Sequence, residues 1–75
     1  MNINEELYAI AKNEHYDKKN YVLAYVIYKE IIELFPHTSE AEKSAFETEG
    51  IERDYPDLMS DYSEEECIRE ILLII

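Results

Sequence analysis

NYVLAYVIYKEIIELFP, the stretch from Asn20 to Pro36, decides the fold of this chain. Its key residues recur at spacings of three and four, which places them on one face of a helix. They are Tyr21, Ala24, Tyr28, Ile31 and Phe35. Pro36 stops the helix because proline lacks an amide proton and disfavours helical geometry in the residue before it. We therefore expect a helix from Asn20 to Phe35.

The beginning of this stretch, YVLAYVIY, also fits a buried strand, since valine, isoleucine and tyrosine favour sheets. The apolar run continues into KEIIEL without losing its helical spacing, and no hairpin turn follows it, so a helix is the better interpretation. The residues between the key positions are apolar too: Val22, Leu23, Val26 and Ile27. A helix that is apolar on nearly every side should lie at the centre and be covered on more than one face.

A shorter helix is expected before this segment, from about Asn4 to Tyr16. Asn2 or Asn4 would cap its first turn, beside glutamates that favour the positive helix end. Its predicted buried stripe is Leu7, Ile10 and Ala11, followed by Glu14 or His15. The polar residues 17–20 then form a turn of the length that joins antiparallel helices.

Two more helices are expected after Pro36. Ser39-x-x-Glu42 has the form of a capping box that starts the third helix, and Gly50 either ends that helix or weakens it on the way to Asp54. Its predicted apolar face is Ala41, Ala45, Phe46 and Ile51. A C-terminal helix should begin near residues 60–63, where Ser63-x-x-Glu66 is a second capping box, and bury Cys67, Ile68, Ile71, Leu72 and Ile75.

The central segment resembles the second helix of a tetratricopeptide repeat, a two-helix unit that stacks with its neighbours to bind other proteins. The matching residues are Asn20, Tyr21, Ala24, Tyr28 and Pro36, with Ile31 where the family usually has a small residue. In the preceding helix Tyr8 matches the family's large residue, whereas Lys12 stands where a glycine or alanine is usual. The resemblance covers about residues 5–48 and fades after Glu49.

The resemblance implies a protein-binding role, but repeat proteins need about three repeats to bury a continuous core. This chain holds one and a half to two repeats. It therefore indicates self-association or the capping of a partner rather than an extended peptide groove.

Size and composition favour one small domain over residues 1–75. The formal charge of −11 repels nucleic acid and anionic lipid and favours basic partners. Cys67 is the only cysteine, so an intrachain disulfide is excluded, and no basic leader or long apolar run is seen. We expect a cytoplasmic protein with no membrane segment.

Candidate chemical groups are few. His15 and His37 lie on different elements and are expected to be solvated or turn histidines rather than metal ligands. The run from Glu64 to Glu66 fits a helix start better than a metal site, because consecutive helical residues point in different directions. We find no nucleophile–base pair, phosphate-binding loop or cofactor motif, and expect no enzyme activity and no cofactor.

The sequence thus predicts an all-α fold of three to four antiparallel helices, a repeat-like hairpin plus a C-terminal helix. The predicted function is a non-catalytic protein-interaction module that self-associates or caps a partner through apolar helix surface with acidic rims. The alternative is a small acidic inhibitor that blocks a basic site on a target. The candidate partner-binding residues are Tyr25, Glu64, Glu65, Glu66, Leu73 and Ile74.

Overall fold

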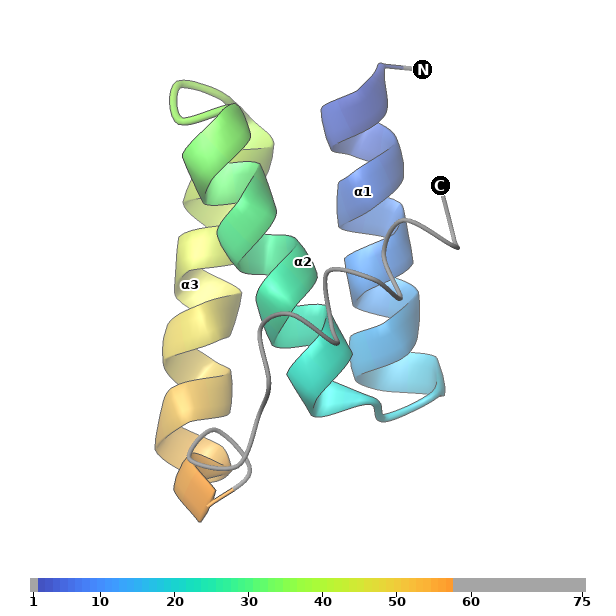
Figure 1. The fold of residues 1–75 in the computed structure, drawn as a ribbon, viewed down its shortest axis with the longest axis vertical. Helices are drawn as coiled ribbons and strands as arrows, with labels where there is room; N and C mark the ends of the chain where they lie inside the picture. Colours follow the sequence, from blue (N-terminus) through green and yellow to red (C-terminus); the bar gives the residue numbers. More distant parts are fainter. Residues whose placement is uncertain (1, 58–75) are drawn as a thin grey trace.

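The fold is all-α, as the sequence predicts. The computed structural model describes residues 2–57, and these contain helices and turns but no strand. The elements are α1 (Ile3–Lys12), the π-helical segment η1 (Asn13–Asp17), α2 (Tyr21–Leu34) and α3 (Ser39–Asp54). In Figure 1 the chain runs down α1, back up α2 and down α3. The expected C-terminal helix, with its capping box and Cys67, lies outside the described residues.

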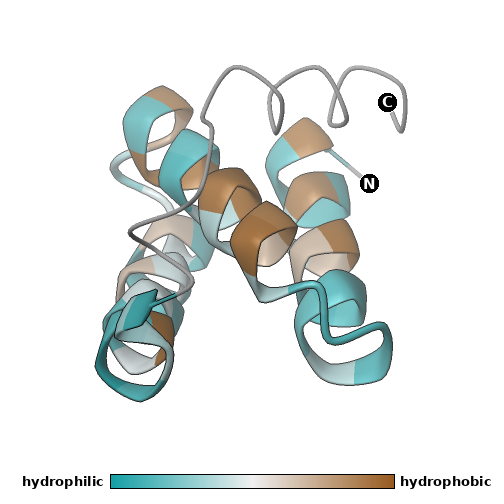
Figure 2. Cartoon of the chain, turned by 60° about the horizontal axis from the view of Figure 1, so that its bottom comes forward, coloured by the Kyte–Doolittle hydropathy of each residue, from teal (hydrophilic) through white to brown (hydrophobic). Residues whose placement is uncertain are grey.

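The segment 21–28 is helical, so the strand alternative is wrong. Asn20 caps α2 by accepting a hydrogen bond from the Leu23 amide, and the helix ends at Leu34, before Phe35 and Pro36. Six consecutive residues, 23 to 28, are buried, together with Ile31. The prediction of a central helix covered on more than one face is confirmed, and the most hydrophobic ribbon in Figure 2 lies between the other two helices.

The first helix departs from the prediction near its end. Asn2 is the cap, since its side chain accepts a hydrogen bond from the Glu5 amide, and the regular helix stops at Lys12. A π-helical turn follows, in which the Lys18 amide bonds to the Asn13 carbonyl at 3.0 Å. Lys19 then takes a left-handed conformation (φ 58°) that reverses the chain into α2.

The N-cap of the third helix is one residue before the predicted cap, Ser39. Thr38, with an extended backbone, is the cap and accepts from the Ala41 amide at 3.2 Å. The Ser39 capping box is therefore wrong, because Ser39 already belongs to the helix. Gly50 does not end α3, which continues to Asp54.

The prediction of the face that α3 buries is confirmed for Ala41 and Ile51 and wrong for Ala45 and Phe46. Its buried residues are Ala41, Ser44, Thr48 and Ile51. Ala45 is exposed, and the Phe46 side chain is 76% exposed. Small side chains on the buried face allow α3 to approach the bulky α2 closely, which leaves Phe46 on the opposite side.

Candidate functional site

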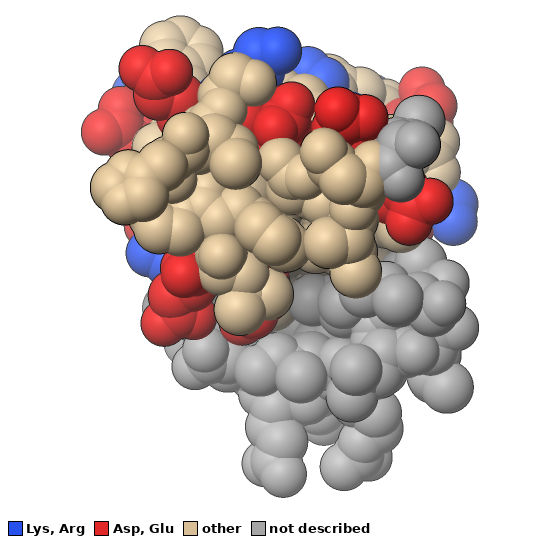
Figure 3. Space-filling model, turned by 90° about the horizontal axis from the view of Figure 1, so that it is seen from above, with Lys and Arg blue, Asp and Glu red and all other residues tan. Residues whose placement is uncertain are grey.

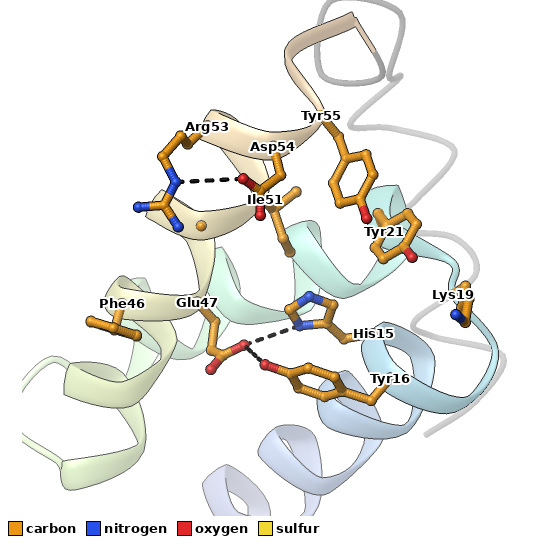
Figure 4. A pocket seen from close by; sticks show the side chains of 11 residues that line it. His15, Tyr16, Lys19, Tyr21, Phe46, Glu47, Ile51, Arg53, Asp54 and Tyr55 are labelled. Atoms are coloured by element: carbon orange, nitrogen blue, oxygen red, sulfur yellow. Dashed lines mark hydrogen bonds and ion pairs between the residues drawn. The ribbon is translucent and has the colours of Figure 1, made fainter.

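A cleft of about 350 Å³ lies between η1 and α3 (Figure 4). Its lining residues are His15 and Tyr16 from η1, Lys19 from the turn, Tyr21 from α2, Phe46, Glu47, Gly50, Ile51, Arg53 and Asp54 from α3, and Tyr55. This volume lies in the range of sites that hold a small ligand or a few side chains of a partner.

Glu47 joins the two sides of the cleft. Its carboxylate accepts a hydrogen bond from the Tyr16 hydroxyl at 2.6 Å, and the Nδ1 atom of His15 lies 3.1 Å from the same oxygen, Oε2. The Lys12 ammonium lies 4.0 Å from the other carboxylate oxygen. Three groups from α1 and η1 thus converge on one side chain of α3 (Figure 4 draws two of them).

His15 is held from several directions. Its Nδ1 atom also lies 3.1 Å from the hydroxyl of Tyr28, which is fully buried in α2. The imidazole stacks on the Tyr16 ring at 4.1 Å and meets the edge of Tyr21 at 5.8 Å. Only 13% of the side chain is exposed, so His15 is not solvated, and of the two predicted alternatives it is the turn that the structure shows. His37, by contrast, is exposed as predicted.

The electrostatics of the cluster favour a neutral histidine. Burial lowers the pKa of His15, and the nearby Glu47 carboxylate offsets only part of that effect. The hydrogen bond to Glu47, followed by burial, raises the pKa of Tyr16 to about 12. Burial raises the pKa of Tyr28 further still. At neutral pH the cluster therefore contains a neutral imidazole, two neutral phenols and one carboxylate.

The contact with Glu47 affects which ring nitrogen of the neutral His15 carries the proton. Because a carboxylate only accepts, the contact with Glu47 favours the tautomer with hydrogen on Nδ1. The Nε2 atom makes no hydrogen bond with residues 2–57 and keeps its lone pair. A carboxylate-oriented imidazole of this kind can accept a proton. The described residues that line the cleft include no serine, threonine or cysteine that could act as its nucleophile.

The edges of the cleft are aromatic and mixed in charge. Tyr21 and Tyr55 stack at 4.1 Å at one edge, and Phe46 projects at the other (Figure 4). Arg53 contacts the neighbouring Asp54 at 3.5 Å, with both side chains largely exposed. The two carboxylates and two cations of the lining cancel in formal charge.

The structure does not place the predicted contact residue Tyr25 in this cleft. Tyr25 is buried, with 7% exposed, and its hydroxyl donates to Glu52 of α3. A role in partner contact would need an accessible ring, whereas helices cover α2 on more than one side and bury Tyr25. The other candidates, Glu64, Glu65, Glu66, Leu73 and Ile74, lie outside the described residues.

Sequence reasoning missed the cleft because its parts are distant in the chain. His15 and Glu47 lie more than thirty positions apart and share no motif. One signal was available: His15 and Tyr16 come directly before the polar turn, where a helix end often deforms. The π-helical turn observed there is a type of distortion that is frequent at functional sites.

Comparison with known proteins adds no assignment. No protein-family model matches the chain, and no curated protein or solved structure shows significant similarity to it. Among residues 2–57 no helix is long and apolar enough to cross a membrane. The same residues contain no group of three or more side chains arranged to hold a metal ion.

Proposed function

We propose that the chain is a non-catalytic protein-interaction module that associates with a second copy through the α3 side of the cleft. The observation that carries the proposal is Phe46, a phenyl side chain that is 76% exposed in the middle of a helix. Single exposed apolar residues are common on protein surfaces. Phe46, however, stands at the rim of a cleft already lined with tyrosines, and aromatic residues are enriched at protein interfaces.

The repeat-like sequence pattern supports the same proposal. The tetratricopeptide-like hairpin that we infer for α1 and α2 belongs to a class of units that bury their cores by stacking on similar units. A chain with no more than two such units gains a larger core by associating with another copy. We also propose a cytoplasmic location, supported by the single cysteine.

Sedimentation equilibrium of the full chain tests this function. We expect a reversible dimer at micromolar to millimolar concentration in moderate salt, and we expect Phe46→Ser to weaken it. Burying each phenyl ring contributes about 1.5–3 kcal/mol, and the substitution removes one ring from each copy, so the dimer dissociation constant should rise by roughly a hundredfold or more. Leu34→Ser is the matched control, because Leu34 is 61% exposed but does not line the cleft. A wild-type chain that stays monomeric throughout would overturn the proposal.

An acidic inhibitor of a basic target is the second candidate, favoured by the charge of −11. On the face shown in Figure 3, acidic side chains lie along several sides of an area without charged residues. Binding of this kind should weaken steeply between low and moderate salt, because exposed charges are screened within about 10 Å at 0.1 M. Neutralising Glu64, Glu65 and Glu66 together should reduce it. A complex with a basic protein that is insensitive to salt would reject this candidate.

A further inference from the structure

Gly50 is the only glycine in the chain and lies inside α3. Apart from proline, glycine is the least favourable residue for a helix interior. A Cβ atom at this position would meet only the end of the Arg53 side chain, at 3.9 Å, which is an ordinary contact. Packing within the described residues therefore gives no reason for glycine here. A reason exists if the backbone of another molecule comes close to α3 at this point.

The neighbours of Gly50 on the same helix face fit such an approach. Phe46 lies one turn before Gly50, and Arg53 and Asp54 lie one turn after it, so all four share one face of α3. All four also line the cleft, and the three side chains are exposed. The face thus presents a large apolar group and a charged pair on either side of a gap.

We propose that the two copies of the self-association proposed above pack α3 against α3 in antiparallel orientation, with the twofold axis at Gly50. This inference rests on the proposed function and adds the geometry of the interface. Antiparallel pairing about Gly50 places Phe46 of each copy beside Arg53 and Asp54 of the other. A twofold interface requires this reciprocity, in which each contact occurs twice.

The chemistry of the face is complementary to itself. A guanidinium packs well on the face of an aromatic ring, so Arg53 of one copy suits Phe46 of the other. Glycine against glycine lets the two helix backbones approach closely, which brings those flanking side chains into reach. The formal charges of the cleft lining cancel, so this region is suited to a second copy although the whole chain is strongly acidic.

Cysteine cross-linking tests the crossing point. In a Cys67→Ser background, Gly50→Cys should form a disulfide-linked dimer as its main product, since the two Cα atoms at the axis would lie within the 7 Å that a disulfide spans. Glu42→Cys in the same background is the control. Residue 42 is exposed on α3, but its two copies would lie about 24 Å apart along the helix axis and should not cross-link.

Gly50→Leu gives an independent readout by sedimentation. A branched side chain at the crossing should raise the dimer dissociation constant by about tenfold or more, because it separates the two backbones. The helical circular dichroism spectrum should be retained, since a Cβ atom at this position makes only an ordinary contact with the end of the flexible Arg53 side chain and leucine favours a helix more than glycine does.

The outcomes separate the two proposals. If the wild-type chain dimerises and Phe46→Ser weakens the dimer, but Gly50→Cys does not cross-link, the α3 crossing is wrong and self-association stands. A Gly50→Leu variant that dimerises as tightly as the wild type would also overturn the crossing. If the wild-type chain is monomeric, both proposals fail.

Discussion

His15 illustrates how one side chain acquires properties that its residue type does not have. In a solvated turn it would titrate near 6.5. In the structure it faces Glu47 from α3, Lys12 from α1, Tyr16 beside it on η1, and Tyr28 and Tyr21 from α2. Removal from water outweighs the attraction of Glu47, so the pKa of His15 is lowered. The folded protein therefore resists protonation at this position.

The stability of the fold should consequently depend on pH through His15. Because the folded pKa of His15 lies below its unfolded value, the unfolded chain binds the extra proton first. The contribution of His15 is complete above about pH 6.5 and decreases as the pH falls from there to the folded pKa. We expect the free energy of unfolding in urea to fall more between about pH 8 and pH 5 for the wild type than for His15→Gln.

His37→Gln is the control for this measurement. It is the same substitution as His15→Gln, but at a histidine that is exposed. Its pH dependence should match that of the wild type. If His15→Gln also retains the wild-type dependence, His15 is not the group responsible.

At the scale of elements, α3 shows why the apolar side of a helix was hard to predict. Its conspicuous apolar residue, Phe46, is exposed, whereas its buried face is built from alanine, serine, threonine and a single isoleucine. Apart from Ile51, the large residues of that interface come from α2, and close packing requires small partners opposite them. Ser44 is one such partner. It is fully buried, and its hydroxyl oxygen has no hydrogen-bond partner within the described residues.

Ser44→Ala should therefore stabilise the protein. The substitution removes a buried polar group without a partner and leaves a side chain of nearly the same size. We expect the free energy of unfolding to rise by about 1 kcal/mol, measured by chemical denaturation. Thr48→Ala is the comparison, because the Thr48 hydroxyl donates to the Ala45 carbonyl and the substitution removes a methyl group from a buried site. It should lower stability, and a destabilised Ser44→Ala would show that its hydroxyl has a partner in solution.

At the scale of the whole molecule, charge opposes compaction. Eighteen acidic and seven basic residues give a formal charge of −11 in 75 residues. A chain of this size buries only about 60% of its unfolded surface, so its margin of stability is small. Long-range repulsion is therefore a substantial cost for this fold, and much of it is open to screening by salt.

Moderate salt should raise the stability of the chain. We expect the midpoint of thermal unfolding at about 150 mM sodium chloride to exceed that at about 10 mM, where the Debye length is roughly 30 Å. The comparison should be made at a protein concentration where sedimentation shows one oligomeric state, since association also raises the midpoint. A midpoint that falls on adding salt would show that attractive surface pairs, such as Arg53 with Asp54, dominate instead.

The helical class, the central position of α2, its cap at Asn20 and its termination before Pro36 were predictable from the sequence, although the helix ends at Leu34, one residue before the predicted Phe35. These follow from local rules of spacing, capping and proline geometry, which act within one or two turns. Only the tertiary structure decided which face of α3 is buried, that Tyr25 is covered, and that His15 meets Glu47. Those outcomes depend on how helices fit against one another across long sequence separations, and no local pattern encodes that fit.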